Sequence, residues 1–396
     1  MINESHFINK FGKGYFSKKS IQDTVKFIHA SDIHLGAAQY RNEYRSDDFV
    51  KAFQEILELG IVHQVDFIIL GGDVFTSLEM LPGKLTKIIS LLKEFKNFTQ
   101  NSIFIIAIEG NHDIRKFSRG VRFERRGQSW LKLLNSLGLI VLLDADLEVP
   151  LEQVFKPYNF KINKGGKIQI KNVVVYGTRY LGEKPIQQLS IIRKAITKEK
   201  GQYNILIQHF GIEGQMDNVP GINLEDIQHL RHRVDYLALG HFHKQFIIDD
   251  WIFNPGSSEA ACVMDHSYKR GIFLVKIAKK ENVLHFTKKV SILRLNNRRY
   301  VWKTIYLNFE VRKKEDLEMI IINKLQNSLK NNGDKIDPSN SRIPLLYLVL
   351  KGLKPLFKVK EKDIRDAICD NLPILDVKLF QKFDEFVKTL DQYIVI

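Results

Sequence analysis

The chain has 396 residues, of which 44% are hydrophobic and 27% charged, a composition typical of a soluble globular protein. It contains two cysteines, Cys262 and Cys369, which excludes a disulfide-rich scaffold and favours a reducing, intracellular location. No apolar run approaches the roughly 18 residues that cross a membrane, and the N-terminus lacks the apolar core of a signal peptide. The net charge of +15 suits a polyanionic partner, because each Lys or Arg that neutralises a phosphate releases condensed counterions.

Buried strands and amphipathic helices alternate along the first three quarters of the chain. After a basic arm (1–23) that we expect to be mobile, strands are predicted at 25–30, 65–70, 103–108, 203–207 and 234–239, and helices at 47–60, 82–95 and 129–137. Residues 161–177 are predicted to form a hairpin around Gly165-Gly166, and further strands are expected at 251–253 and 271–277. This alternation predicts an α/β domain, in which ligands gather at the carboxyl ends of the strands.

The last hundred residues have a different character. The predicted elements are a strand (301–309), a helix (313–330), a strand (345–350), a short helix (360–370), a strand (374–379) and a helical stretch (383–393). We therefore predict two domains, 24–295 and 296–396, of which the second is a compact α+β unit without chemistry of its own.

Five polar signatures each follow a predicted strand. They are Asp32-Ile33-His34, Gly72-Asp73, Gly110-Asn111-His112-Asp113, His209 and Gly240-His241-Phe242-His243. Their nitrogen and oxygen side chains are ligands for divalent metals, and two adjacent metals are a common device for cleaving phosphate esters. Residues i and i+2 of an extended segment point the same way, so Asp32 and His34 are expected to reach one ion together. His241 and His243 are expected either to share one ion or to divide between two, and Gly110 to allow the sharp turn that presents Asn111.

These stretches resemble the calcineurin-like metallophosphoesterase superfamily, and more closely its DNA-repair nuclease branch, the meiotic recombination eleven nuclease that is called SbcD in bacteria. The residues that carry the resemblance are FIHASDIHLG (27–36), VDFIILGGDVF (65–75), IFIIAIEGNHD (103–113), ILIQHFGIEG (205–214), YLALGHFHK (236–244) and FNPGSSE (253–259). The archaeal members look most similar. The resemblance implies an αββα sandwich of two mixed sheets flanked by helices, followed by a small DNA-binding capping domain.

The resemblance also implies roles for individual residues. One metal would be held by Asp32, His34, Asp73 and His243, and the other by Asp73, Asn111, His209 and His241, with Asp73 bridging two Mn²⁺ ions per subunit; iron and zinc are alternatives. A metal-activated hydroxide would attack phosphorus, and His112 would stabilise the developing charge and protonate the leaving oxygen. Asp113 would either orient His112 or support its loop.

Two departures from the family pattern bear on activity. Thr76 stands where many members have a histidine tied to exonucleolytic positioning of DNA, so endonuclease activity is expected more firmly than 3′-to-5′ exonuclease activity. The chain ends at Ile396, before the segments with which members grip their ATPase partner, which leaves 383–393 as the candidate. A basic cluster follows the His112 loop and is expected to track a DNA backbone: Arg115, Lys116, Arg119, Arg122, Arg125 and Arg126.

The function implied by the resemblance is a two-metal DNA nuclease that processes ends in double-strand-break repair. Its implied partners are DNA, an SbcC-type coiled-coil ABC ATPase and a second copy of the chain, bound through 82–95 and 129–137. The implied location is cytoplasmic, at the nucleoid, with no membrane association. Two alternatives stay open: a phosphatase or phosphodiesterase for small phosphate esters, and a DNA-binding scaffold with weak catalysis. The net charge and the C-terminal unit favour a polymeric substrate.

Overall fold

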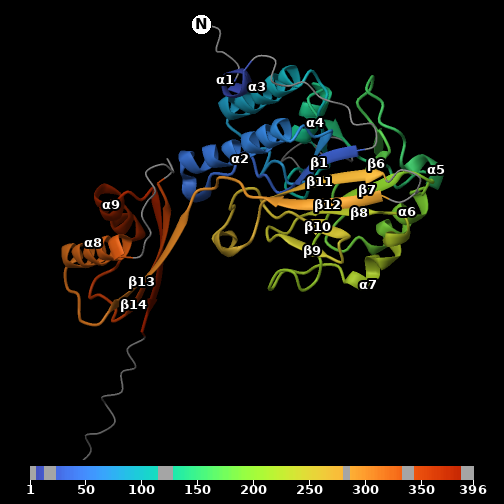
Figure 1. Cartoon of the computed structure of the whole chain (residues 1–396). Helices are drawn as coiled ribbons and strands as arrows, with labels where there is room; N and C mark the ends of the chain where they lie inside the picture. The colour runs from blue at the N-terminus through green and yellow to red at the C-terminus, as the bar shows by residue number, and fades with distance from the viewer. Residues whose placement is uncertain (1–5, 13–23, 115–127, 280–285, 332–342, 385–396) are drawn as a thin grey trace, which may run out of the picture. The chain divides into compact units, whose positions relative to one another are not determined.

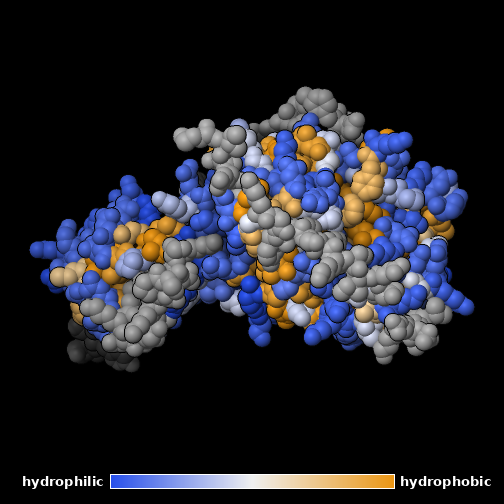
Figure 2. All heavy atoms as spheres, turned by 45° about the horizontal axis from the view of Figure 1, so that its top comes forward, coloured by the Kyte–Doolittle hydropathy of each residue, from blue (hydrophilic) through white to orange (hydrophobic). Residues whose placement is uncertain are grey.

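The computed structural model of the chain describes residues 6–12, 24–114, 128–279, 286–331 and 343–384 (Figure 1). The chain separates into two compact units, Met1–Asn296 and Asn297–Ile396. Hydrophilic residues cover most of the visible face of each unit, with hydrophobic residues in separate patches between them (Figure 2). Within the described residues, no helix combines the length and the apolar composition that a bilayer crossing requires.

The first sheet of the larger unit is mixed and has the strand order β12-β11-β1-β2-β3-β4. Its strands are β1 (Thr24–Ala30), β2 (Phe67–Leu70), β3 (Phe104–Ala107), β4 (Val141–Leu142), β11 (Ile272–Lys279) and β12 (Phe286–Leu293). The first four are parallel, and β11 and β12 are antiparallel to their neighbours. The helices α2 (Glu43–Val62), α3 (Pro82–Phe98) and α4 (Trp130–Ser136) cover its outer face (Figure 1).

Local sequence explains where these helices begin. The side chain of Asn42 accepts a hydrogen bond from the Tyr44 amide and caps α2, and Ser129 caps α4 in the same way through the Leu131 amide. Pro82 occupies the first turn of α3, where its missing N–H costs no helical hydrogen bond. The helices therefore start at defined residues and present one apolar stripe to the sheet.

The second sheet of this unit has the order β5-β6-β7-β8-β10-β9. Its strands are β5 (Lys167–Ile170), β6 (Val173–Gly177), β7 (Tyr203–His209), β8 (Tyr236–Gly240), β9 (Phe246–Ile248) and β10 (Ile252–Asn254). The short helices α5 (Leu151–Val154), α6 (Ile186–Ala195) and α7 (Leu224–Ile227) pack on its outer face. Three 3₁₀ turns, η1 (Gln39–Arg41), η2 (Gln228–His232) and η3 (Met264–Ser267), lie in the connections.

The predicted hairpin in this sheet exists, but its turn lies elsewhere. β5 and β6 pair antiparallel across Lys171 and Asn172, and Lys171 has a φ of 53°. Gly165 is needed for space instead, because a Cβ there would lie 2.4 Å from the backbone of Tyr158. The Gly-Gly pair was therefore a sign of close packing and not of the turn.

The two sheets face each other across an aromatic and aliphatic core. Phe27 of β1 stacks on Phe67 at 4.9 Å and contacts the edge of Tyr236 from the opposite sheet at 5.3 Å. Tyr236 in turn stacks on Phe253 at 4.2 Å. The predicted sandwich of two mixed sheets flanked by helices is therefore confirmed.

Part of the expected mobile arm is ordered. His6–Phe11 form the helix α1, whose Phe7 is fully buried against Phe95 and Phe98 of α3. His6 and Lys10 both pair with Glu58 of α2. The prediction of a mobile arm considered only its basic residues. Burial of the apolar Phe7 holds α1 against α3.

In the described part of the smaller unit, three parallel strands form one sheet: β13 (Tyr300–Leu307), β14 (Leu345–Gly352) and β15 (Asp376–Phe383). The helices α8 (Lys314–Asn331) and α9 (Glu361–Asn371) connect them in the predicted order. Apolar residues of both helices pack with those of the strands in one core, which includes Leu317, Ile321, Ile364 and Leu348. The predicted final helical stretch lies outside the described residues, except for its first residues at the end of β15.

The core between the sheets should dominate the stability of the larger unit. Phe27→Ala removes a fully buried ring from both the sheet-to-sheet contact and the stack, and should lower the free energy of unfolding by about 3–5 kcal/mol. The same change at Phe160, which is 58% exposed, should cost less than about 1 kcal/mol. Urea unfolding of both variants tests this, and equal losses would contradict the assigned core.

Candidate metal centre

The predicted ligands converge because five strands end at the same edge of the sandwich. Asp32 and His34 follow β1, Asp73 follows β2 and Asn111 follows β3, all in the first sheet. From the second sheet come His209, the last residue of β7, and His241 and His243 after β8. Among the described residues, two groups have ligand atoms within 4.8 Å of one another: Asp32, His34 and His243, and Asp73, His209 and His241.

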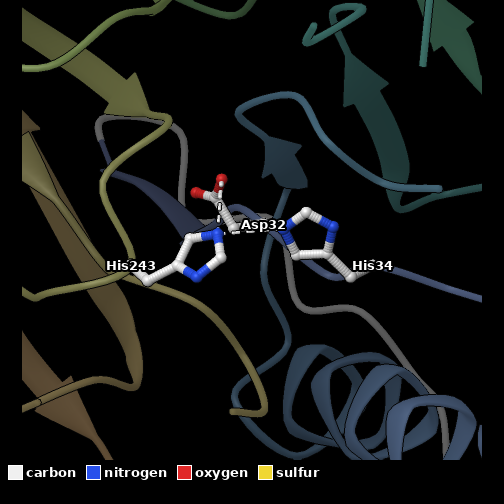
Figure 3. Close-up of side chains that lie close together, drawn as sticks. All are labelled: Asp32, His34 and His243. Carbon is white, nitrogen blue, oxygen red and sulfur yellow. Dashed lines mark hydrogen bonds and ion pairs between the residues drawn. The ribbon is translucent and has the colours of Figure 1, made fainter. Parts of the chain in front are cut away.

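The first group brings together residues far apart in sequence (Figure 3). The Nε2 atoms of His34 and His243 face each other at 3.0 Å, and Nε2 of His243 lies 3.9 Å from Oδ1 of Asp32. Two imidazole nitrogens and a carboxylate directed at one point are a typical donor set for a divalent cation.

The second group includes the asparagine that the sequence predicted. Nε2 of His209 lies 3.2 Å from Oδ2 of Asp73. The amide oxygen of Asn111 lies 3.1 Å from both Nε2 of His209 and Nδ1 of His241. His241 and His243 therefore divide between the two groups, which was one of the two arrangements expected.

The prediction that Asp32 and His34 reach one ion together assumed an extended backbone, but the backbone at the site is not extended. Four of the predicted ligands have a positive φ: Asp32 (50°), His34 (53°), Asp73 (49°) and His241 (91°). Non-glycine residues rarely adopt this region, and such strain collects at functional sites. Asp32 and His34 thus reach the same group because the chain reverses at each of them, and not because a strand alternates.

Gly110 also has a different purpose from the one predicted. A Cβ at this position would lie 2.2 Å from Oδ1 of Asp73. Glycine therefore lets the β3 loop approach the Asp73 carboxylate, which accepts a hydrogen bond from the His112 amide at 2.8 Å. This contact fixes the two loops relative to each other.

Hydrogen bonds on the far side of two rings decide which nitrogen faces the site. Nδ1 of His209 lies 2.8 Å from the carbonyl oxygen of Gly71, which only accepts, so Nδ1 carries the proton and Nε2 faces Asp73. Nδ1 of His243 donates to Oδ2 of Asp265 at 2.8 Å, which leaves its Nε2 for the first group. Metal-binding histidines are commonly oriented by a carbonyl or a carboxylate in this way.

The electrostatics of the two groups differ. Burial opposes the charged form of His209, but the facing Asp73 carboxylate outweighs it and raises the pKa of His209 to about 9. Burial lowers the pKa of His34 to about 3, helped by the charge of His243, and it lowers that of His241 to about 4, helped by His209. At neutral pH, His34 and His241 therefore have lone pairs available for a cation.

The side chains of the predicted catalytic pair, His112 and Asp113, lie in different surroundings and have different partners. His112 is exposed, its ring contacts that of His34 at 5.2 Å, and its Nδ1 donates to the carbonyl oxygen of Thr76 at 3.1 Å. Asp113 is buried and accepts from the amides of Val74, Phe75 and Gly110 at 2.8–3.2 Å. Asp113 therefore holds the β2 and β3 loops together, which is the second of the two roles expected for it.

Two residues that lie at the site, Asp265 and Tyr180, were not predicted from the sequence. Asp265, in η3, orients His243 and also accepts from the amides of Ala261 and Cys262. Tyr180 lies with its ring centroid 6.0 Å from that of His209 and 6.1 Å from that of His241. Neither follows a strand that carries a signature, so only spatial proximity identifies them.

The donor set fits two divalent metals. It consists of carboxylate, amide and imidazole groups without a thiolate, and each group has an imidazole that is neutral at pH 7. The same side chains packed without a cation would leave ring nitrogens of His34 and His243 facing each other at hydrogen-bond distance.

The sequence profile of the calcineurin-like phosphoesterase family matches residues 25–245. The chain belongs to this family. The predicted metal-dependent phosphoesterase is thereby confirmed, because the family profile covers all seven predicted ligands and the two groups that they form.

Curated relatives carry the name DNA double-strand break repair protein Mre11. The chain is 28% identical to that of Archaeoglobus fulgidus over 59% of this chain and 50% of the relative. It is 26% identical to that of Saccharolobus solfataricus over 93% and 84%, and 22% identical to that of Sulfurisphaera tokodaii over 86% and 77%. The chain thus spans about half the length of the first relative and most of the other two. The predicted similarity to archaeal members of the repair-nuclease branch is confirmed.

The predicted DNA-tracking cluster of this phosphoesterase (Arg115, Lys116, Arg119, Arg122, Arg125 and Arg126) lies outside the described residues.

Removing the charge of Asp265 should weaken the metal centre without removing a ligand. In Asp265→Asn, His243 loses the anion that orients it, and the affinity for a divalent metal should fall about tenfold. Asp249→Asn, an exposed carboxylate on the same unit, serves as control and should change nothing. Calorimetric titration with Mn²⁺ measures both, and unchanged affinity in Asp265→Asn would refute the positioning role.

The His209–Asp73 pair should make the stability of the metal-free phosphoesterase depend on pH. Because its pKa rises from 6.5 to about 9 on folding, protonated His209 stabilises the fold fully below pH 6.5, and this contribution is lost as the pH rises through 9. The difference in unfolding free energy between wild type and His209→Gln should thus fall by ~3 kcal/mol from pH 6.5 to 9.5. Urea unfolding in chelator measures it, and parallel pH profiles for the two proteins would contradict the charged pair.

Proposed function

We propose that this phosphoesterase is a two-metal DNA nuclease that processes ends in double-strand-break repair, with Mn²⁺ as its native metal. The observation that carries the proposal is the pair of adjacent donor groups, with the exposed His112 ring beside the first of them. The names of the archaeal relatives and the net charge of +15 support DNA as the substrate.

The side chains at the site would have two roles, binding the ions and orienting the ligands. Asp32, His34 and His243 would hold one ion, and His209, His241 and Asn111 the other, with Asp73 shared. When bound, the two ions would lower the pKa of a water held between them and neutralise charge on the phosphate. Asp265 and the Gly71 carbonyl keep His243 and His209 in the required tautomers.

His112 would act on the leaving group. The Thr76 carbonyl accepts from its Nδ1, so Nε2 is the nitrogen that can exchange a proton with the leaving oxygen. Its exposed position above the His34 ring suits contact with a bound phosphate.

Thr76 bears on the mode of cleavage. Its hydroxyl donates to the His34 carbonyl at 3.3 Å and its own carbonyl holds His112, so this position stabilises the centre without adding a cationic group for DNA. We therefore propose mainly endonucleolytic cleavage, with 3′-to-5′ exonuclease activity as the weaker mode.

The partners and the location are part of the same proposal. The similarity to Mre11 proteins supports a complex with a Rad50-like, SbcC-type coiled-coil ATPase, a homodimer formed through α3 and α4, and action at the nucleoid in the cytoplasm. The smaller unit would serve as a DNA-binding capping domain. The seven predicted ligands, six of which lie in the two groups, favour catalysis over a scaffold with weak activity.

Mn²⁺-dependent cleavage of end-labelled linear duplex and of closed circular single-stranded DNA tests the proposal. His112→Gln should lower kcat by about 10²–10⁴, because general acid catalysis is lost while the ligands remain. His232→Gln, the same change at an exposed histidine of η2, should leave cleavage unchanged. Cutting of circles but not of ends would support the endonucleolytic mode.

A small chromogenic phosphodiester completes the design. If it is hydrolysed in an His112-dependent manner while neither DNA is cut, the nuclease proposal fails and a small-ester hydrolase takes its place.

A further inference from the structure

Within the described residues, the helices of the smaller unit pack on one face of its sheet. Apolar side chains of α8 and α9 pack against Val301, Ile305 and Leu307 and the matching residues of β14 and β15, so both helices lie on the same face. Parallel sheets are ordinarily covered on both faces. No described helix of this unit packs on the opposite face, which we call the outer face.

The outer face carries aromatic rings in place of the usual polar residues. The alternation along β13 places Tyr300, Trp302 and Tyr306 there, and Tyr347 and Phe380 come from β14 and β15. Trp302 and Phe380 stack at 5.5 Å with an interplanar angle of 22°, and Tyr347 contacts the edges of both. Trp302 remains 45% exposed and Tyr306 53% exposed.

Cations border these rings. The strand register places Tyr306, Lys351 and Lys382 in one row across the three strands. Nζ of Lys351 lies 5.7 Å from the centre of the Tyr306 ring, and Lys382 is exposed. The outer-face carboxylate within these strands, Asp376, is buried. Within the three strands, the groups that this face offers to solvent are thus rings, a threonine (Thr304) and lysines, of which Lys378 pairs with Glu361 of α9. The exposed Asp384 comes one residue after β15.

This combination matches one kind of ligand. Exposed rings on an open sheet offer flat surfaces to unpaired bases, and a flanking row of lysines offers counter-charges to the phosphates that connect them. A duplex hides its bases within the stack and would gain only from the lysines. An apolar protein segment would match the rings but not the lysines.

We propose that the outer face of β13-β14-β15 binds single-stranded DNA, with bases stacked on Trp302 and Tyr306 and the backbone along Lys351 and Lys382. The proposal builds on the nuclease function by assigning the smaller unit a preference for unpaired strands, such as those at processed ends. Binding here needs neither metal ligands nor cleavage.

The test uses the full chain in chelator, so that binding is measured without cleavage. A labelled oligo(dT) of about 15 nucleotides should bind, and Trp302→Ala should weaken this binding about tenfold while changing duplex affinity by less than about twofold. Trp302→Phe keeps a ring and should restore most of the affinity. Equal losses for duplex and single strand, or no loss, would overturn the stacking platform.

A second variant tests the same site with a change that does not disturb the core of the smaller unit. Thr304 is exposed on β13 between the two rings, so Thr304→Glu adds a charge that repels phosphate without entering the core. Asn323→Glu adds the same charge to the exposed side of α8, whose other side packs on the inner face. Thr304→Glu should weaken oligo(dT) binding about tenfold and Asn323→Glu less than about twofold, and equal effects would refute the assigned face.

The outcomes separate this proposal from the nuclease. Loss of cleavage with Trp302-dependent oligo(dT) binding intact would refute the nuclease alone. If DNA is cleaved but oligo(dT) binding is unchanged in Trp302→Ala and Thr304→Glu, the proposed single-strand site on the outer face is refuted and the nuclease proposal stands.

Discussion

The contact between His209 and Asp73 joins the two sheets of the larger unit at the point where its chemistry lies. His209 ends a strand of the second sheet, whereas Asp73 and Gly71 follow a strand of the first, and His209 bonds to both. Asp32 of the first sheet likewise accepts from the amide of His241 in the second, at 3.1–3.2 Å. Elsewhere the sheets meet through Phe27, Tyr236 and their neighbours, so apolar packing sets the distance between the sheets and these polar contacts set the geometry of the site.

The arrangement has a cost in the absence of a cation. Buried carboxylates, an imidazole pair at 3.0 Å and reversed backbone at four ligands all raise the free energy of the folded chain. Ion pairing between His209 and Asp73 and the bonds to Asp265 offset part of this. A bound divalent cation would offset more, since it replaces repulsion among donors by attraction to a shared charge.

The sequence predicted the larger architecture because its signals are local. Buried strands ending in polar signatures identify the α/β sandwich, and each of the seven ligands follows a strand of predictable position. The spacing of the residues alone could not explain how the two metal-binding groups form. Asp32 and His34 come together through left-handed backbone, and Gly110 matters because its missing side chain lets the β3 loop approach Asp73. Asp265 and Phe7 were missed for a related reason: each acts through a partner distant in sequence, and neither lies in a recognisable pattern.

The central claim is that seven side chains from five strand ends form one centre for two ions. Anomalous diffraction at the manganese absorption edge, from crystals grown with Mn²⁺, tests it directly. The account predicts two peaks, one among Asp32, His34 and His243 and one among Asn111, His209 and His241, with Asp73 in contact with both. A single peak, or a peak that leaves either group without an ion, would contradict it.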